Sequence, residues 1–347
     1  MSVIIGWDIG GAHLKAARSE AGRIVRAVQV PSPLRLGLPR LAAAFAEVKA
    51  AIGDAGRHVA TMTGELADTF ASRGEGVREL AALVARALAP ADVAIYAGPA
   101  GFIRANVACD HVRDIASANW HASASLIAHA KREALFMDMG STTTDVVPIV
   151  HNEVRARGYT DAERLEAGEL VYTGLVRSFL MAVSDRAPFT GRWTTLINEN
   201  FATMADIHRI LGSLPADADQ MSTADGREKT IEASRARLAH MVGCDAADAT
   251  DEAWLGLARW FAEAQMRTII DAAMLAASRG EVPPDSPVVG AGIGAAVLRE
   301  VARRLGRDYV AFETLLDVDP LAREAASRCA PAAALALLAA RQSRLGA

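Results

Sequence analysis

One short loop of this chain, residues 138–145, reads Asp138-Met139-Gly140-Ser141-Thr142-Thr143-Thr144-Asp145. It follows an apolar run, residues 134–137, that is typical of a buried strand. The loop combines acid, glycine and hydroxyl side chains, which is a poor composition for a core and a good one for contacts with anions and metals. An ordinary Ser/Thr-rich turn has the same composition, so the loop alone leaves a purely structural role open.

The same order of features occurs about 130 residues earlier in the chain. There a short apolar run, residues 3–7, leads into Asp8-Ile9-Gly10-Gly11, and an extended pattern resumes at His13-Leu14-Lys15. Each loop precedes a hairpin pattern, so a strand, an Asp-x-Gly loop and a hairpin recur in the two halves. This predicts a fold built by internal duplication, although so short a repeat also arises by coincidence.

The rest of the chain alternates strand and helix patterns, which predicts an α/β fold with two lobes. We expect an N-terminal lobe over residues 1–130 and a C-terminal lobe over residues 131–347. A helical elaboration of the second lobe is predicted over about 160–280, interrupted by a polar loop at 212–226. A late strand with a Gly-rich turn follows at about 288–294.

Composition restricts the setting of the protein. The formal charge of −4 over 347 residues gives no basic field for nucleic acid. The apolar run Cys329–Ala340 is shorter than the roughly 20 residues that span a bilayer, so no membrane contact is expected. The cysteines are odd in number and far apart, and the N-terminus has no signal-peptide pattern. These features favour the cytoplasm, and a homo-oligomer is compatible with them.

The two Asp-x-Gly loops have the chemistry of a phosphate site. Glycine lets backbone amides approach phosphate oxygens, Asp8 and Asp138 can hold a hydrated Mg²⁺ ion, and Lys15 can neutralise a phosphate. The alternative is a pair of hairpins that need glycine, with Asp8 solvated and Lys15 on the surface. The predicted phosphate-binding residues are Gly10, Gly11, Gly140, Ser141, Thr142 and Thr143.

Two further segments are weaker candidates. Gly290 and Gly292 open a helix pattern, where glycine admits an anion or a flat base but equally permits tight strand–helix packing. Glu65 follows a predicted strand in Thr63-Gly64-Glu65-Leu66, so its carboxyl group can point between the lobes. We assign Gly290 and Gly292 to phosphate binding and Glu65 to catalysis as expectations.

These motifs resemble a known superfamily. Gly6–Lys15 and Asp138–Thr142 are similar to the two phosphate motifs of the actin, heat-shock ATPase and sugar-kinase superfamily, and Val289–Gly292 is similar to its adenosine-side motif. The resemblance implies a two-lobed, duplicated ribonuclease-H-like fold. Several intervening segments look like the hydantoinase/oxoprolinase-related branch, namely Thr63–Leu66, Ala118–Trp120, Gly168–Gly174 and Asn200–Asp206.

Within that branch the chain most resembles tetrahydromethanopterin-linked one-carbon transfer pathway proteins, a group that includes a methanofuran-pathway condensing enzyme. The resemblance implies transfer of an aminomethylfuran-methyl group from its diphosphate to the phenol oxygen of a tyramine- or tyrosine-type acceptor. Asp8, Asp138 and Lys15, with Mg²⁺, would neutralise the leaving diphosphate. Glu65 is the candidate general base, and the role of Asp145 stays open.

Two other functions fit the same motifs: an ATP-dependent small-molecule kinase and a non-catalytic, nucleotide-responsive regulator of one-carbon metabolism. Diphosphate release without ATP distinguishes the transferase from the kinase, and nucleotide binding without turnover indicates the regulator. For the transferase, we expect the helical elaboration to form the acceptor pocket, since it carries aromatic and arginine side chains. These include Tyr172, Arg177, Trp254 and Arg259.

Overall fold

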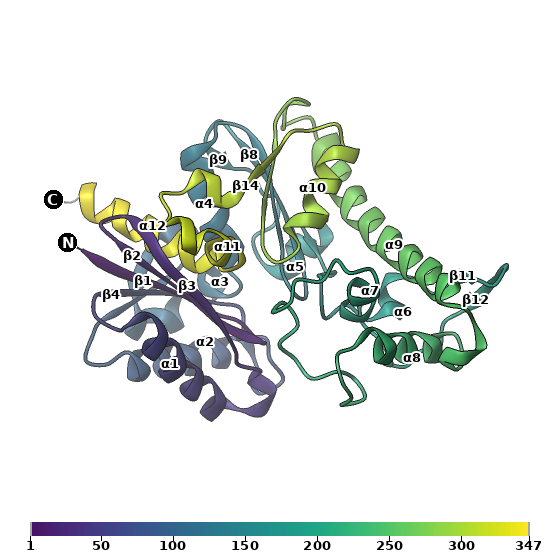
Figure 1. The fold of residues 1–347 in the computed structure, drawn as a ribbon. Helices are drawn as coiled ribbons and strands as arrows, with labels where there is room; N and C mark the ends of the chain where they lie inside the picture. The colour runs from purple at the N-terminus through teal and green to yellow at the C-terminus, as the bar shows by residue number, and fades with distance from the viewer. Residues whose placement is uncertain (1, 346–347) are drawn as a thin grey trace.

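The computed structural model describes residues 2–345 and contains two sheets with the same core topology (Figure 1). The first sheet has the order β3-β2-β1-β4-β5-β6, in which β1 pairs antiparallel with β2 and parallel with β4. Its strands are β1 (Val3–Ile9), β2 (His13–Glu20), β3 (Arg23–Pro31), β4 (Arg57–Met62), β5 (Val93–Tyr96) and β6 (Phe102–Arg104).

The second sheet repeats this arrangement with the order β10-β8-β7-β13-β14, and β9 also pairs with β8. Its central strand β7 pairs antiparallel with β8 and parallel with β13, as β1 does with β2 and β4. The duplication predicted from the two Asp-x-Gly loops is therefore confirmed. The strands are β7 (Ala134–Met139), β8 (Thr144–Val150), β9 (Glu153–Val154), β10 (Leu170–Val171), β13 (Val288–Ala291) and β14 (Tyr309–Ala311).

Helices cover the sheets and fill the space between them. In the first lobe, α1 and α2 pack with the apolar face of the first sheet in one buried core. The helix α4 packs on β7 and β8, and α12 packs on β1 and β2, so these two helices contact each other between the sheets. The helices of this part are α1 (Leu38–Ile52), α2 (Arg73–Ala87), α3 (Val112–Ile115), α4 (Asn119–Ala130), α11 (Arg323–Arg328) and α12 (Ala330–Leu345).

The position of α12 departs from the predicted lobe boundary. Sequence order placed all of residues 131–347 in the second lobe, but the yellow α12 lies over the purple strands of the first sheet (Figure 1). The reason lies in β1: Gly6 has no side chain, which lets the α12 backbone at Ala332 and Ala336 approach it directly. The alanine-rich face of α12 then fills the layer between the sheets.

Because of this close approach, we expect Gly6→Ala to destabilise the protein by about 1–3 kcal/mol. A methyl group at Gly6 would overlap the carbonyl oxygen of Ala332, a backbone atom that cannot rotate away. Gly256→Ala is the matched control and should be neutral or stabilising. Gly256 lies in a helix, and an added Cβ there would meet nothing within 4 Å among residues 2–345 apart from its chain neighbours and the adjacent helix backbone. Urea unfolding of both variants checks this. Equal midpoints for the two variants would contradict the packing described.

The helical elaboration extends from the second lobe and has its own apolar core around Phe189, Trp254 and Phe261. It also contains the antiparallel hairpin β11 (Arg186–Phe189) and β12 (Arg192–Thr195), where the sequence predicted mostly helices. The polar loop predicted at 212–226 is confirmed, since residues 212–230 form no helix or strand. The helices here are α5 (Asp161–Glu166), α6 (Leu180–Val183), α7 (Met204–Ile210), α8 (Ile231–Met241), α9 (Asp251–Ser278) and α10 (Ala295–Arg304).

Candidate active site

The two Asp-x-Gly loops form equivalent tight turns. The amide of Gly10 donates to the carbonyl of His13 at 3.0 Å, and the amide of Gly140 donates to the carbonyl of Thr143 at 2.9 Å. Strand register then places Lys15 opposite Asp8 in the first lobe. In the second lobe the same register places Asp145 opposite Asp138. The duplication thus carries one change in charge, because an acid replaces the lysine.

The acidic side chains of the two lobes lie close enough to affect each other. The pKa of Asp138 is raised to about 7, chiefly by burial; the Lys15 charge lowers it, and the charges of Asp145 and Asp8 raise it. Burial also raises the pKa of Asp8, whose Oδ2 lies 4.0 Å from the Lys15 ammonium. The structure therefore brings Asp8, Asp138 and Lys15 together at the junction of the lobes, as the sequence predicted.

The junction is suited to a magnesium ion. Asp8 is almost fully buried, and its Oδ1 has no hydrogen-bond partner among residues 2–345. Within the same residues no three acidic, histidine or cysteine side chains form a ready-made metal cage. Two carboxylates with waters and phosphate oxygens are the usual ligands of Mg²⁺, so Asp8 and Asp138 fit a metal that binds together with a phosphate compound.

The other predicted phosphate-binding residues have distinct surroundings. Gly11 is exposed with open space where a Cβ would lie, and the hydroxyl residues Ser141, Thr142 and Thr143 are half-buried. Gly174 packs against the backbone of Ser141 and Thr142 and so fixes the second loop.

The third Gly-rich segment is closely packed. Gly292 has a φ of 87° and lies against the Asp138 carboxylate and the Met139 carbonyl, where a side chain would overlap both. Gly290 faces the ring of Tyr309 within the sheet. Gly292 therefore allows the end of β13 to reach Asp138. At Gly290, close packing against Tyr309 is enough to explain why the residue is glycine.

Asp145 has a partner that the sequence did not suggest. The guanidinium of Arg164 lies 2.9 Å from the Asp145 carboxylate and also donates to the carbonyl of Glu169. This fully buried arginine stacks over the ring of Trp120 at 4.1 Å. Its only sequence signal is its place after the helix-capping residues of α5, Thr160 and Glu163, and capping gives no indication of an active site.

Glu65 is buried beside the same junction. Its Oε1 accepts a hydrogen bond from Ser117 at 3.0 Å, and Ser117 also lies 2.9 Å from Asp161 of the other lobe. Its Oε2 has no hydrogen-bond partner among residues 2–345. The pKa of Glu65 is raised to about 7, chiefly by burial; its own backbone amide and the Ser117 hydroxyl lower it, and the Asp161 charge raises it. The side chain is therefore poised between its acid and base forms near neutral pH.

The Asp138 pKa makes the stability of the protein pH-dependent. Its ordinary value of 3.8 rises to about 7 on folding, so between these values the folded protein retains a proton that the unfolded chain has released. The free energy of unfolding therefore falls as pH rises through this range.

We accordingly expect Asp138→Asn to have a Tm several degrees above that of the unmodified protein at pH 8 in chelator, with a smaller difference at pH 5. Each pKa unit corresponds to about 1.4 kcal/mol, which supports a shift of this size. Thermal melts at both pH values measure it. A difference that does not depend on pH would contradict the raised pKa.

A pocket of about 290 Å³ is lined by Arg35 of the first lobe and by residues between 176 and 224 of the second. Arg177, one of the residues predicted for an acceptor pocket, lines this pocket, and its guanidinium lies 3.3 Å from the Thr142 hydroxyl. Trp254, which the sequence suggested for the same site, is instead buried in the core of the elaboration against Phe189. Its helical spacing is equally that of a core residue.

Comparison with known proteins identifies the family of the chain. The hydantoinase/oxoprolinase family profile matches residues 57–341. The chain belongs to the hydantoinase/oxoprolinase family. It is 32% identical over 245 residues to the (4-{4-[2-(gamma-L-glutamylamino)ethyl]phenoxymethyl}furan-2-yl)methanamine synthase of Methanocaldococcus jannaschii, covering 70% of this chain and 72% of that protein. A protein of the same name from Methanococcus vannielii is 33% identical over 114 residues, which is 33% of this chain and 51% of that protein.

Solved structures support the fold. Acetone carboxylase in its nucleotide-free form superposes with a TM-score of 0.60 at 11% identity, covering 95% of this chain and 70% of that one. The predicted fold of two lobes with duplicated sheets is confirmed by the sheet topology, and acetone carboxylase has a similar fold. Within residues 2–345, every helix is too short or too polar to cross a membrane.

Proposed function

We propose that this protein forms an aryl alkyl ether in the biosynthesis of a methanofuran-type coenzyme. It joins an aminomethylfuran-methyl diphosphate to the phenol oxygen of a tyramine- or tyrosine-type acceptor and releases diphosphate. The observation that carries the proposal is the meeting of two phosphate-type turns at Asp8, Lys15 and Asp138. The name of the relative from Methanocaldococcus jannaschii describes an ether of this kind.

The reaction needs charge neutralisation more than covalent chemistry. The bond between the furan methylene and the diphosphate oxygen breaks, and the diphosphate leaves with both electrons. The phenol oxygen then bonds to the methylene and loses its proton to a base. Lys15 and the amides of the two turns stabilise the leaving diphosphate. A magnesium ion held by Asp8 and Asp138 supplies further Lewis-acid stabilisation when bound.

Glu65 is the proposed base for the phenol proton, because one of its oxygens has no hydrogen-bond partner among the described residues and its pKa is about 7. A base must be ionised, so the rate should rise with pH through about 7, and Glu65→Gln should abolish that rise. Asp138 titrates in the same range, but its proton competes with the metal. An apparent pKa in the pH–rate profile that shifts with Mg²⁺ concentration is therefore assigned to Asp138. An apparent pKa that stays constant with Mg²⁺ concentration is assigned to Glu65.

The function is tested with the purified protein, Mg²⁺, a synthetic aminomethylfuran-methyl diphosphate, and tyramine or tyrosine. We expect release of diphosphate and an ether product by mass spectrometry, without ATP. Formation of ADP from ATP with a phosphorylated product would instead identify a kinase. Nucleotide binding without any turnover would identify a regulator.

A further inference from the structure

Each phosphate turn positions one arginine at the pocket of about 290 Å³. In the first lobe, the carbonyl of Gly11 accepts a hydrogen bond from the amide of Leu34, which begins the short 3-10 helix η1 (Leu34–Leu36) and precedes Arg35. In the second lobe, the amide of Arg177 donates to the Ser141 carbonyl at 2.8 Å. Both arginines line the pocket, although they come from opposite lobes.

These two arginines carry charge that the pocket does not balance. Within residues 2–345, neither Arg35 nor Arg177 forms an ion pair, and the hydroxyl of Thr142 is the polar contact of Arg177. The charge of Arg177 also reaches the first lobe, since it helps to lower the pKa of the buried His13 to about 3, after burial itself and Lys15. His13 is therefore neutral near pH 7 and adds no positive charge beside Arg177.

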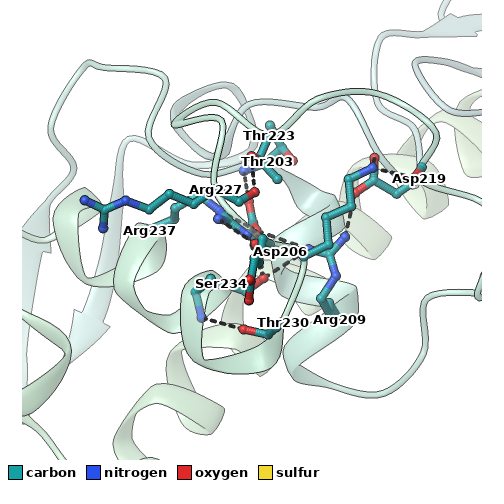
Figure 2. Close-up of polar contacts among 12 residues, drawn as sticks. Thr203, Asp206, Arg209, Asp219, Thr223, Arg227, Thr230, Ser234 and Arg237 are labelled. Atoms are coloured by element: carbon teal, nitrogen blue, oxygen red, sulfur yellow. Dashed lines mark hydrogen bonds and ion pairs between the residues drawn. The ribbon is translucent and has the colours of Figure 1, made fainter.

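The carboxylates in the pocket wall are already neutralised. Figure 2 shows Asp206 at the centre of a polar network that includes Arg209 and Arg237. Asp206 also accepts hydrogen bonds from Ser234 and from the amide of Thr203. Its charge therefore serves the packing of α7 against α8 and does not offset the pocket arginines.

The polar loop at residues 212–230 forms part of the pocket wall, and ion pairs also hold it in place. Asp219 pairs with Arg209 at 2.6 Å and with Lys229 at 3.4 Å. The next residue, Gln220, accepts a hydrogen bond from Gln29 on β3 of the first lobe. The loop thus crosses from one lobe to the other, and it adds Met221 and the hydroxyl residues Ser222 and Thr223 to the pocket wall.

We propose that Arg35 and Arg177 form a clamp between the lobes for an anionic group of a bound substrate. The anion is a phosphate of a diphosphate or the carboxylate of a phenolic amino acid, because a guanidinium recognises both groups through paired N–H donors. Phe179 and Met221 give the same pocket an apolar wall for the body of a small organic ligand. The identity of these substrates rests on the proposed function, whereas the anion clamp rests on the pocket alone.

The test is calorimetric titration of the unmodified protein, Arg35→Gln and Arg86→Gln. Arg86 is exposed in the first lobe and lies outside the pocket, so Arg86→Gln is the matched control. The probes are inorganic diphosphate with Mg²⁺, and the pair L-tyrosine and tyramine, which differ in one carboxylate. Arg35 is exposed, so the substitution should leave the fold intact, and a thermal melt checks this.

We expect Arg35→Gln to weaken one of these interactions roughly 10- to 100-fold. Weaker diphosphate binding identifies the phosphate as the clamped group. Weaker binding of tyrosine with unchanged binding of tyramine identifies the carboxylate. Equal affinities of Arg35→Gln and Arg86→Gln for every probe, or no binding of any probe by the unmodified protein, would overturn the clamp.

These measurements require no turnover and are therefore independent of the ether-forming reaction. A protein that binds diphosphate through Arg35 but forms no ether retains the clamp and loses the proposed function. Ether formation with Arg35→Gln indistinguishable from the unmodified protein in both binding and KM would retain the function and remove the clamp.

Discussion

Asp8→Asn and Asp138→Asn should each lower kcat on the order of 10²–10³-fold, the loss seen when one electrostatic contact to a transition state is removed. Both carboxylates lie at the junction of the lobes, and Asp8 has a buried oxygen without a partner among residues 2–345. Asparagine keeps the size of the side chain but removes the charge that would hold magnesium. Diphosphate release measured against Mg²⁺ concentration checks this.

The fold of both variants should survive, because burial disfavours the ionised form of both acids and asparagine removes the cost of burying that charge. Asp92→Asn is the control, since Asp92 is exposed and lies near the start of β5 in the first lobe. Thermal melting separates lost turnover from lost structure. If both folded variants kept the rate of the unmodified protein, Asp8 and Asp138 would be ordinary loop residues and the metal site would be rejected.

The core of this site could be predicted from the sequence because its residues are local to two repeated turns. The Asp-x-Gly pattern gives Asp8 and Asp138, and strand register two residues beyond each turn gives the positions of Lys15 and Asp145. Duplication of a strand, a turn and a hairpin requires the two copies to use the same topology, which the sheets confirm. Local patterns thus specify both the fold class and the acids at its centre.

The residues that complete the site come from elsewhere in the chain. Their local sequence patterns are equally typical of residues outside a site, so these patterns alone do not identify a site. Arg35 lies in a short 3-10 turn, and Arg177 precedes the hairpin β11–β12 that the sequence did not predict. Arg164 occupies a helix position typical of a surface arginine, yet it is fully buried. The alanine-rich α12 has no strong amphipathic pattern because both of its faces are covered, so its place between the sheets follows from tertiary packing.

Arg164→Met should destabilise the protein by about 3–5 kcal/mol, because the half-buried carboxylate of Asp145 loses the cation that is paired with it. Methionine retains much of the side-chain length and can still pack on Trp120, so the lost charge dominates the effect. Urea unfolding at pH 8 measures the change. We expect Arg164→Met to shift the midpoint far more than Arg267→Met, an exposed position on α9.

The pH dependence and a double variant distinguish a lost ion pair from lost packing. Without Arg164 the folded pKa of Asp145, already raised by burial, rises further, so the folded variant holds a proton that the unfolded chain has released. The stability deficit should therefore grow as pH rises and shrink as pH falls. Asp145→Asn combined with Arg164→Met removes the uncompensated charge and should recover part of the loss at pH 8. A deficit that is constant with pH and unchanged in the double variant would mean that Arg164 stabilises the junction through packing alone, and that Asp145 does not depend on it for its charge.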